Sequence, residues 1–302
     1  SAFFKLTTQE RIEQILESTG GDDMAQNMET VFAALIHKLP KEEKKEFRQI
    51  LMQCTLQRRA KVFEEVVLME CANSKLFDPS PSGFEELVAT VISVIDVTQE
   101  ITDWESICEA LDALLRQASL QEISLELSRR LEDAADGAHL GAALERNGMD
   151  VSLSQLKNLS SVDGEKLLKS VHGHAVRSGR RWSDAQWDEL LSDLMTIAVG
   201  IGRHSEMQLN LEDVRVDYFQ TLLRACKFSL ADAYMKHNLE PQVAEDIAWK
   251  IGREMLCAIT DLESVASIED TRRCFDLFPS SQRARKEAEK LKALMVIQSN
   301  FG

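Results

Sequence analysis

Two histidines, His172 and His174, are the nearest approach to a metal-binding pair in the sequence. A zinc site needs three or four ligands that converge on one ion. Residues two apart on a helix point roughly 200° away from each other, so these two imidazoles cannot share an ion unaided. No cysteine or acidic residue stands beside them at a ligand spacing. The pattern favours polar residues near a helix end, and we expect no metal.

The run Gly200-Ile-Gly-Arg-His204 resembles half of a phosphate-binding loop. A dinucleotide fingerprint needs a third glycine and a preceding strand, and the sequence supplies neither. A helix terminus with a turn explains the run better. We therefore expect no bound cofactor.

The six cysteines are dispersed, and no two of them form a C-x-x-C pair. Zinc sites and secreted disulfide frameworks use tighter spacings or smaller chains, so we expect reduced cysteines buried on helices, in a reducing compartment. Neighbouring glutamates such as Glu85 and Glu86 fit solvated helix faces, because catalytic carboxylates come from separate elements. We predict a protein without enzymatic activity. The alternative is a helical enzyme with a polar pocket where groups of shifted pKa converge.

Two basic clusters lie in the second half of the sequence. The loop of residues 177–182 combines arginines with a tryptophan, a pairing that is frequent among binding hot spots. Its other interpretation is a solvated loop in which Trp182 packs on Trp187. The second cluster opens the last predicted helix. Our candidates for partner binding are Arg180, Arg181, Trp182, Arg283, Arg285 and Lys286.

The net charge of −15 is unevenly distributed. Residues 1–150 carry 15 basic and 28 acidic residues, whereas residues 151–302 carry 20 and 22. This balance argues against nucleic-acid partners and against direct docking on an anionic membrane. Basic side chains at the start of the last helix oppose the helix dipole, at a cost of about 0.3–1 kcal/mol. We expect acidic partner segments to dock on the second half; the alternative is a solvated face without function.

Helix signals follow one another along the chain. Thr7 begins a capping box, residues 22–39 repeat apolar residues at threes and fours, and Pro40 fits the start of the next helix. Strand alternation is absent from the sequence. The predicted fold is all-α, with about a dozen antiparallel helices stacked as irregular pairs into an α-solenoid. We expect five leucines to be buried between neighbouring helices: Leu190, Leu191, Leu194, Leu222 and Leu223.

The domain prediction is one continuous segment, residues 1–302, with possible sub-boundaries near residues 76–83 and 175–183. The chain opens with Ser1 rather than Met, which we interpret as a cleavage scar and hence as a piece of a longer protein. No run of 18 apolar residues is present, so we expect no transmembrane helix. A compact bundle is the alternative to the solenoid.

Four phrases follow one another in the last third of the chain. They are Trp187 to Thr196, Tyr218 to Ala231 with its Leu-Leu-Arg-Ala-Cys core, Thr271 to Pro279, and Glu287 to Leu294. Over residues 187–302 this series resembles the neuroblastoma-amplified sequence family (NBAS), in its secretory-pathway "Sec thirty-nine" domain. Residues 1–180 are compatible with the solenoid that precedes this region in the family.

The resemblance implies a non-enzymatic scaffold. Members of this family are long α-solenoids that form part of the Dsl-type tethering complex at the endoplasmic reticulum (ER). That complex captures Golgi-derived COPI vesicles in retrograde transport and binds SNAREs. The implied partners are the other tether subunits and the ER SNAREs, and the implied location is cytoplasmic, peripheral at the ER. The alternative is another helical scaffold: a Rod-like kinetochore subunit, a coat subunit or an adaptor.

Overall fold

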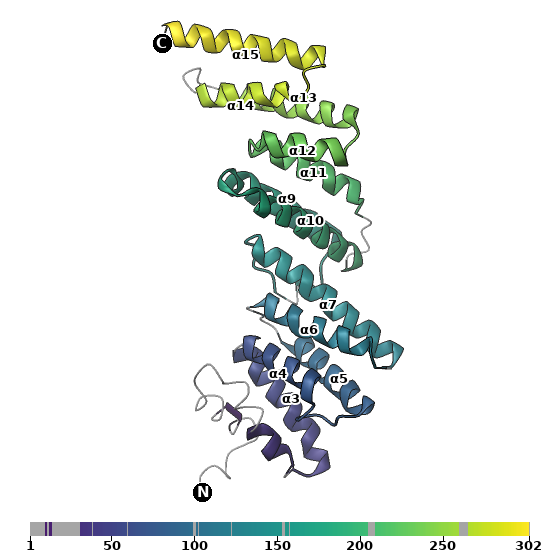
Figure 1. Ribbon diagram of the computed structural model, residues 1–302. Helices are drawn as coiled ribbons and strands as arrows, with labels where there is room; N and C mark the ends of the chain where they lie inside the picture. Colours follow the sequence, from purple (N-terminus) through teal and green to yellow (C-terminus); the bar gives the residue numbers. More distant parts are fainter. Residues whose placement is uncertain are drawn as a thin grey trace. The chain divides into compact units, whose positions relative to one another are not determined.

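The computed structural model describes residues 10, 12–13, 31–37, 39–58, 60–98, 101, 103–121, 123–152, 155–156, 158–204, 209–259 and 265–301. Every regular element in these ranges is a helix, which confirms the all-α fold class (Figure 1). The capping residue Thr7 and most of the helix predicted over residues 22–39 lie outside the described residues. Within the described ranges, no helix has both the length and the apolar character that a membrane crossing requires.

The chain divides into two compact units. The first contains residues 1–146 and 150–159, and the second contains residues 147–149 and 160–302. The helices of the first unit are α3 (Lys41–Arg58), α4 (Ala60–Asn73), α5 (Pro81–Val97), α6 (Trp104–Ala118) and α7 (Leu125–Arg146). Helix α3 packs on α4 and α5, while α7 packs on α5 and α6, and α4 packs on α6.

Local capping explains where the helices of the first unit begin. The Ser80 hydroxyl accepts a hydrogen bond from the Gly83 N–H at 3.2 Å, and Pro81 occupies the first turn, where its missing N–H costs nothing. The Asp103 carboxylate accepts the Ser106 N–H at 3.0 Å and begins α6. These two caps determine where α5 and α6 begin.

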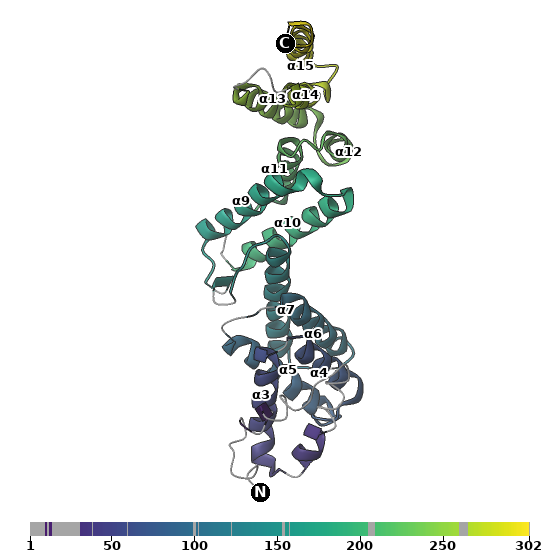
Figure 2. The ribbon, with the colours of Figure 1, turned by 90° about the vertical axis from the view of Figure 1, so that its left-hand side faces the viewer.

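The second unit contains a longer succession of helices. They are α9 (Ser161–Ser178), η2 (Gly179–Arg181), α10 (Asp184–His204), α11 (Leu211–Arg224), α12 (Phe228–Asn238), α13 (Pro241–Ala258), α14 (Val265–Asp276) and α15 (Gln282–Phe301). Figure 2 shows α13 packed with α14, and α15 packs on α14 in turn. Helix α11 packs on α9, α10, α12 and α13. In both units the principal packings join α-helices one or two places apart along the chain.

The core of the second unit matches the predicted leucines closely. Leu190, Leu194, Leu222 and Leu223 are buried, as predicted, whereas Leu191 is only half-buried. The spacing of the four buried leucines places them on the faces through which α10 and α11 pack on each other. The last turn of α10 contains the Gly200–His204 run, so this run is a helix end, as the sequence indicates.

The division between the units falls at residues 147–160 rather than at the two sub-boundaries that the sequence suggests. Residues 74–80 do form the loop between α4 and α5, and residues 179–183 do separate α9 from α10. However, α5 packs back on α3, and α10 packs back on α9. A break in the helical pattern is therefore not a break in packing.

Candidate functional site

The first predicted cluster is built on the loop between α9 and α10. Its tryptophan, Trp182, is half-buried and lies 5.4 Å from the Trp187 ring and 6.0 Å from His174, between ring centroids. The Trp182 carbonyl also accepts a hydrogen bond from the Lys227 ammonium at 2.6 Å. Trp182 therefore packs on Trp187, as one of the two interpretations of the loop expects, and it remains half-buried.

The two arginines of this loop differ in their surroundings. The Arg180 guanidinium makes an ion pair with Asp270 of α14, a residue 90 positions further along the chain. Arg181 is exposed and makes no ion pair with any residue that the structure describes. Arg180 therefore has an acidic partner inside its own unit, and Arg181 presents its charge to solvent.

The second predicted cluster lies at the start of α15. Arg283 donates to the Glu245 carboxylate at 3.0 Å and to Asp246, both on α13. Its guanidinium also lies 5.3 Å from the centre of the Trp249 ring, which Arg253 approaches at 5.7 Å. This pairing lowers the pKa of Asp246, chiefly through its hydrogen bond with Arg283.

These contacts correct the reasoning that led from the sequence to an acidic partner at Arg283. The cost of a cation at the helix start is offset inside the chain, because Glu245 lies beside the same turn. Its carboxylate accepts a hydrogen bond from the Ser281 hydroxyl at 2.7 Å. The Ser281 hydroxyl in turn accepts the Ala284 N–H at 3.4 Å, as a helix cap does. An external acid is not needed to explain Arg283.

Three of the candidate residues present free basic groups. Arg181, Arg285 and Lys286 are exposed, and none of them pairs with an acidic group in the described part of the chain. All the hydrogen-bond donors of these three charged groups are therefore available to the carboxylates of a partner. Of the candidate residues in the two predicted basic clusters, the unpaired cations in the described part are therefore Arg181 in the loop between α9 and α10, and Arg285 and Lys286 at the start of α15.

The histidine pair is divided between two separate environments. His172 Nδ1 lies 2.7 Å from the Thr221 hydroxyl of α11, and burial lowers the pKa of His172 to about 4, with a smaller effect from Arg224. His174 instead packs on Trp182. Among the described residues, no group of three or more histidine, cysteine or acidic side chains is arranged to hold a metal ion.

All six cysteines carry thiols rather than disulfides, and three of them, Cys54, Cys108 and Cys274, are buried. Cys71 and Cys226 are half-buried, and Cys257 is exposed, so burial is only partly as predicted. Burial raises the pKa of Cys108 and Cys274 to about 12. These two thiols stay protonated at neutral pH, and a protonated thiol is a poor nucleophile.

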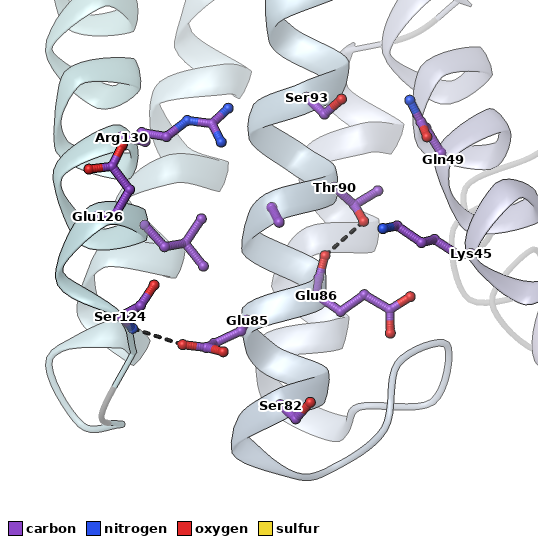
Figure 3. Close-up of a pocket in the computed structure, with 12 residues that line it drawn as sticks. Lys45, Gln49, Ser82, Glu85, Glu86, Thr90, Ser93, Ser124, Glu126 and Arg130 are labelled. Atoms are coloured by element: carbon purple, nitrogen blue, oxygen red, sulfur yellow. Dashed lines mark hydrogen bonds between the residues drawn. The ribbon is translucent and has the colours of Figure 1, made fainter.

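Sequence reasoning missed a groove of about 600 Å³ in the first unit (Figure 3). Helix α5 forms its floor, α3 lines one side with Lys45 and Gln49, and α7 lines the other with Glu126 and Arg130. The signal that could have found it is the stripe of small residues along α5, which includes Ser82, Ala89 and Ser93. Small side chains at helical spacing leave room between the longer side chains of the flanking helices.

Comparisons of the chain with protein-family models, with curated proteins and with solved structures each find no match. The described part of the chain is an all-helical protein in which each α-helix packs chiefly on helices one or two places away along the chain.

Proposed function

We propose that this chain is a non-enzymatic scaffold segment of an ER tethering complex that captures Golgi-derived COPI vesicles and binds SNAREs. The observation that carries the proposal is where the family-like phrases lie. Their aromatic residues Trp187, Tyr218, Phe219 and Phe275 are among the largest fully buried side chains of the chain. The phrases that resemble the family therefore contribute large aromatic residues to the packing core of the second unit.

The aromatic core links four helical elements by direct contacts. The Trp187 indole donates through Nε1 to the Gly179 carbonyl at 3.1 Å. The backbone carbonyl of Trp187 accepts a hydrogen bond from the Tyr218 hydroxyl at 2.9 Å. Tyr218 in turn meets Tyr234 of α12 edge-on at 4.9 Å. Because these contacts fix η2, α10, α11 and α12 to one another, the surface around Arg181 and Trp182 has a defined geometry. A scaffold needs such fixed positions to hold its partners.

The partners that suit the two basic clusters are acidic segments of tether subunits or SNAREs. Arg181 in one cluster, and Arg285 with Lys286 in the other, would attract carboxylates, and the half-buried Trp182 would supply apolar contact area. In this proposal the chain is cytoplasmic and reaches the ER membrane through its partners. It requires no cofactor and no nucleic acid.

Localisation of the tagged full-length protein tests this proposal. We expect a reticular or punctate ER signal that persists through the cell cycle, because a tether remains with its SNAREs. A core variant, Trp187→Ala, serves as the control for loss of the folded second unit and should become diffuse. A wild-type signal that concentrates on mitotic kinetochores, with no ER signal, would overturn the tether and support the Rod-like alternative.

A further inference from the structure

The groove between α3, α5 and α7 has the shape of a docking site for a polypeptide segment. Ser82, Ala89 and Ser93 follow one another at spacings of seven and four along its floor, so they lie on one stripe of α5. This stripe covers about three helical turns, or roughly 16 Å. The side chains that rise above it belong to different helices, α3 and α7 (Figure 3). A floor of small residues between two raised edges leaves space for one chain segment.

Polar groups along the groove are only partly engaged. The Glu85 carboxylate accepts the Ser124 N–H at 2.8 Å, and Glu86 pairs with Arg48 at 2.8 Å. Gln49, Ser82 and Ser93 make no hydrogen bond with the described residues through their side chains. These amide and hydroxyl groups can therefore bond the backbone of an incoming segment.

The unbalanced charges of the groove are mainly negative. Arg130 is paired with Asp96 at 3.4 Å, which offsets its positive charge. Glu126 is exposed and has no cationic partner in the described part, and Glu85 has only its backbone donor. Lys45 is the opposing cation, on the α3 side of the groove. Two carboxylates without a cationic partner, on the α7 side of α5, thus outnumber the single ammonium on the α3 side.

We propose that this groove binds a basic segment of a partner polypeptide. Lysine or arginine side chains of the segment pair with Glu85 and Glu126, while the floor of α5 contacts its backbone. The acidic balance of residues 1–150 steers such a segment toward the first unit. The inference deepens the proposed scaffold function by giving the first unit a partner class opposite in charge to that of the second unit.

Fluorescence anisotropy with a labelled lysine-alanine peptide of about 10 residues tests the groove, with a glutamate-alanine peptide as the opposite probe. We expect the full chain to bind the basic peptide and not the acidic one. Glu85→Gln with Glu126→Gln should weaken binding about fivefold to tenfold at low salt, the loss expected from two exposed ion pairs. Ala89→Trp should weaken it by a similar factor, because the indole fills the floor without changing charge.

Matched controls separate the groove from general attraction to an acidic protein. Glu109→Gln with Glu132→Gln removes the same charge from α6 and from a face of α7 about 120° away from Glu126. Ala72→Trp adds an indole on α4, outside the groove. Both controls should bind like the wild type. Equal weakening by the controls, equal binding of the acidic peptide, or no binding of the basic peptide would overturn the proposal. Because no ER component enters this titration, its failure is separate from failure of the tether function.

Discussion

Replacing Trp187 by alanine is expected to destabilise the second unit by about 3–5 kcal/mol, the range for truncation of a fully buried aromatic side chain. The indole is completely buried and lies against Trp182 and Tyr218. It also lies so close to Gly179 that a Cβ built there would be 2.4 Å from the ring. Truncation therefore opens a cavity and removes the indole donor from the Gly179 carbonyl, which keeps only the Trp182 N–H at 3.0 Å.

Hydrogen exchange measured by mass spectrometry reports this loss separately for each unit. The amides of α10 and α11 should lose protection in Trp187→Ala, while those of α3 to α7 keep theirs. Val199→Ala on the same helix is the control, because Val199 is 43% exposed and its truncation should change stability by less than about 0.5 kcal/mol. Equal protection in the two variants would contradict the placement of this ring in the core.

Replacing Glu70 by alanine is the second change for which we expect a large effect. Glu70 is 1% exposed, and its carboxylate accepts the N–H groups of Lys75, Leu76 and Phe77 at 3.2, 2.8 and 3.1 Å. The N–H groups of Leu76 and Phe77 are buried, and each orphaned buried donor costs about 1–3 kcal/mol. The free energy of unfolding of the first unit should fall by roughly 2–6 kcal/mol.

Urea denaturation followed by circular dichroism measures this change. Glu109→Ala is the control: this residue is exposed on α6, so its loss should cost less than about 0.5 kcal/mol. The loop that Glu70 holds also receives Arg48, which donates to the Leu76 carbonyl at 2.7 Å. A Glu70→Ala midpoint that matches the Glu109→Ala midpoint would show that the loop does not depend on this carboxylate.

Local patterns predicted the helices and most of the core. Pro40, which was predicted to stand at a helix start, directly precedes α3, and the spacing of Leu190 and Leu194 identifies the buried face of α10. These features depend on residues a few positions apart, so they can be recognised in the sequence. Leu191 was predicted buried but lies at the edge of that face, because helical spacing gives the centre of an apolar stripe more reliably than its border.

The partners of charged groups could not be predicted in the same way. Asp270 meets Arg180 from 90 positions away, and Glu245 meets Arg283 from 38 positions away. Such pairs depend on how helices stack, which no local spacing encodes. For the same reason the sequence suggested free cations at both positions, and the groove between α3, α5 and α7 was not foreseen.

The structure therefore changes which residues a binding experiment should target. Reversing the charge of Arg283 would break its bonds to Glu245 and Asp246 as well as any bond to a partner. Arg181, Arg285 and Lys286 are exposed and make no such internal pair in the described part. Substitutions at these three positions separate binding from folding.

We propose that this chain holds tether subunits and SNAREs, and direct capture tests this function most simply. The immobilised full chain should retain purified tether subunits or the cytosolic parts of ER SNAREs. Retention should be lost in Arg181→Glu with Arg285→Glu and Lys286→Glu. It should be kept in the matched reversal of Lys250, Arg253 and Lys292, which are also exposed and make no ion pair in the described part. Capture of none of these proteins by the folded wild type, or equal loss in both triple variants, would contradict the proposed scaffold function.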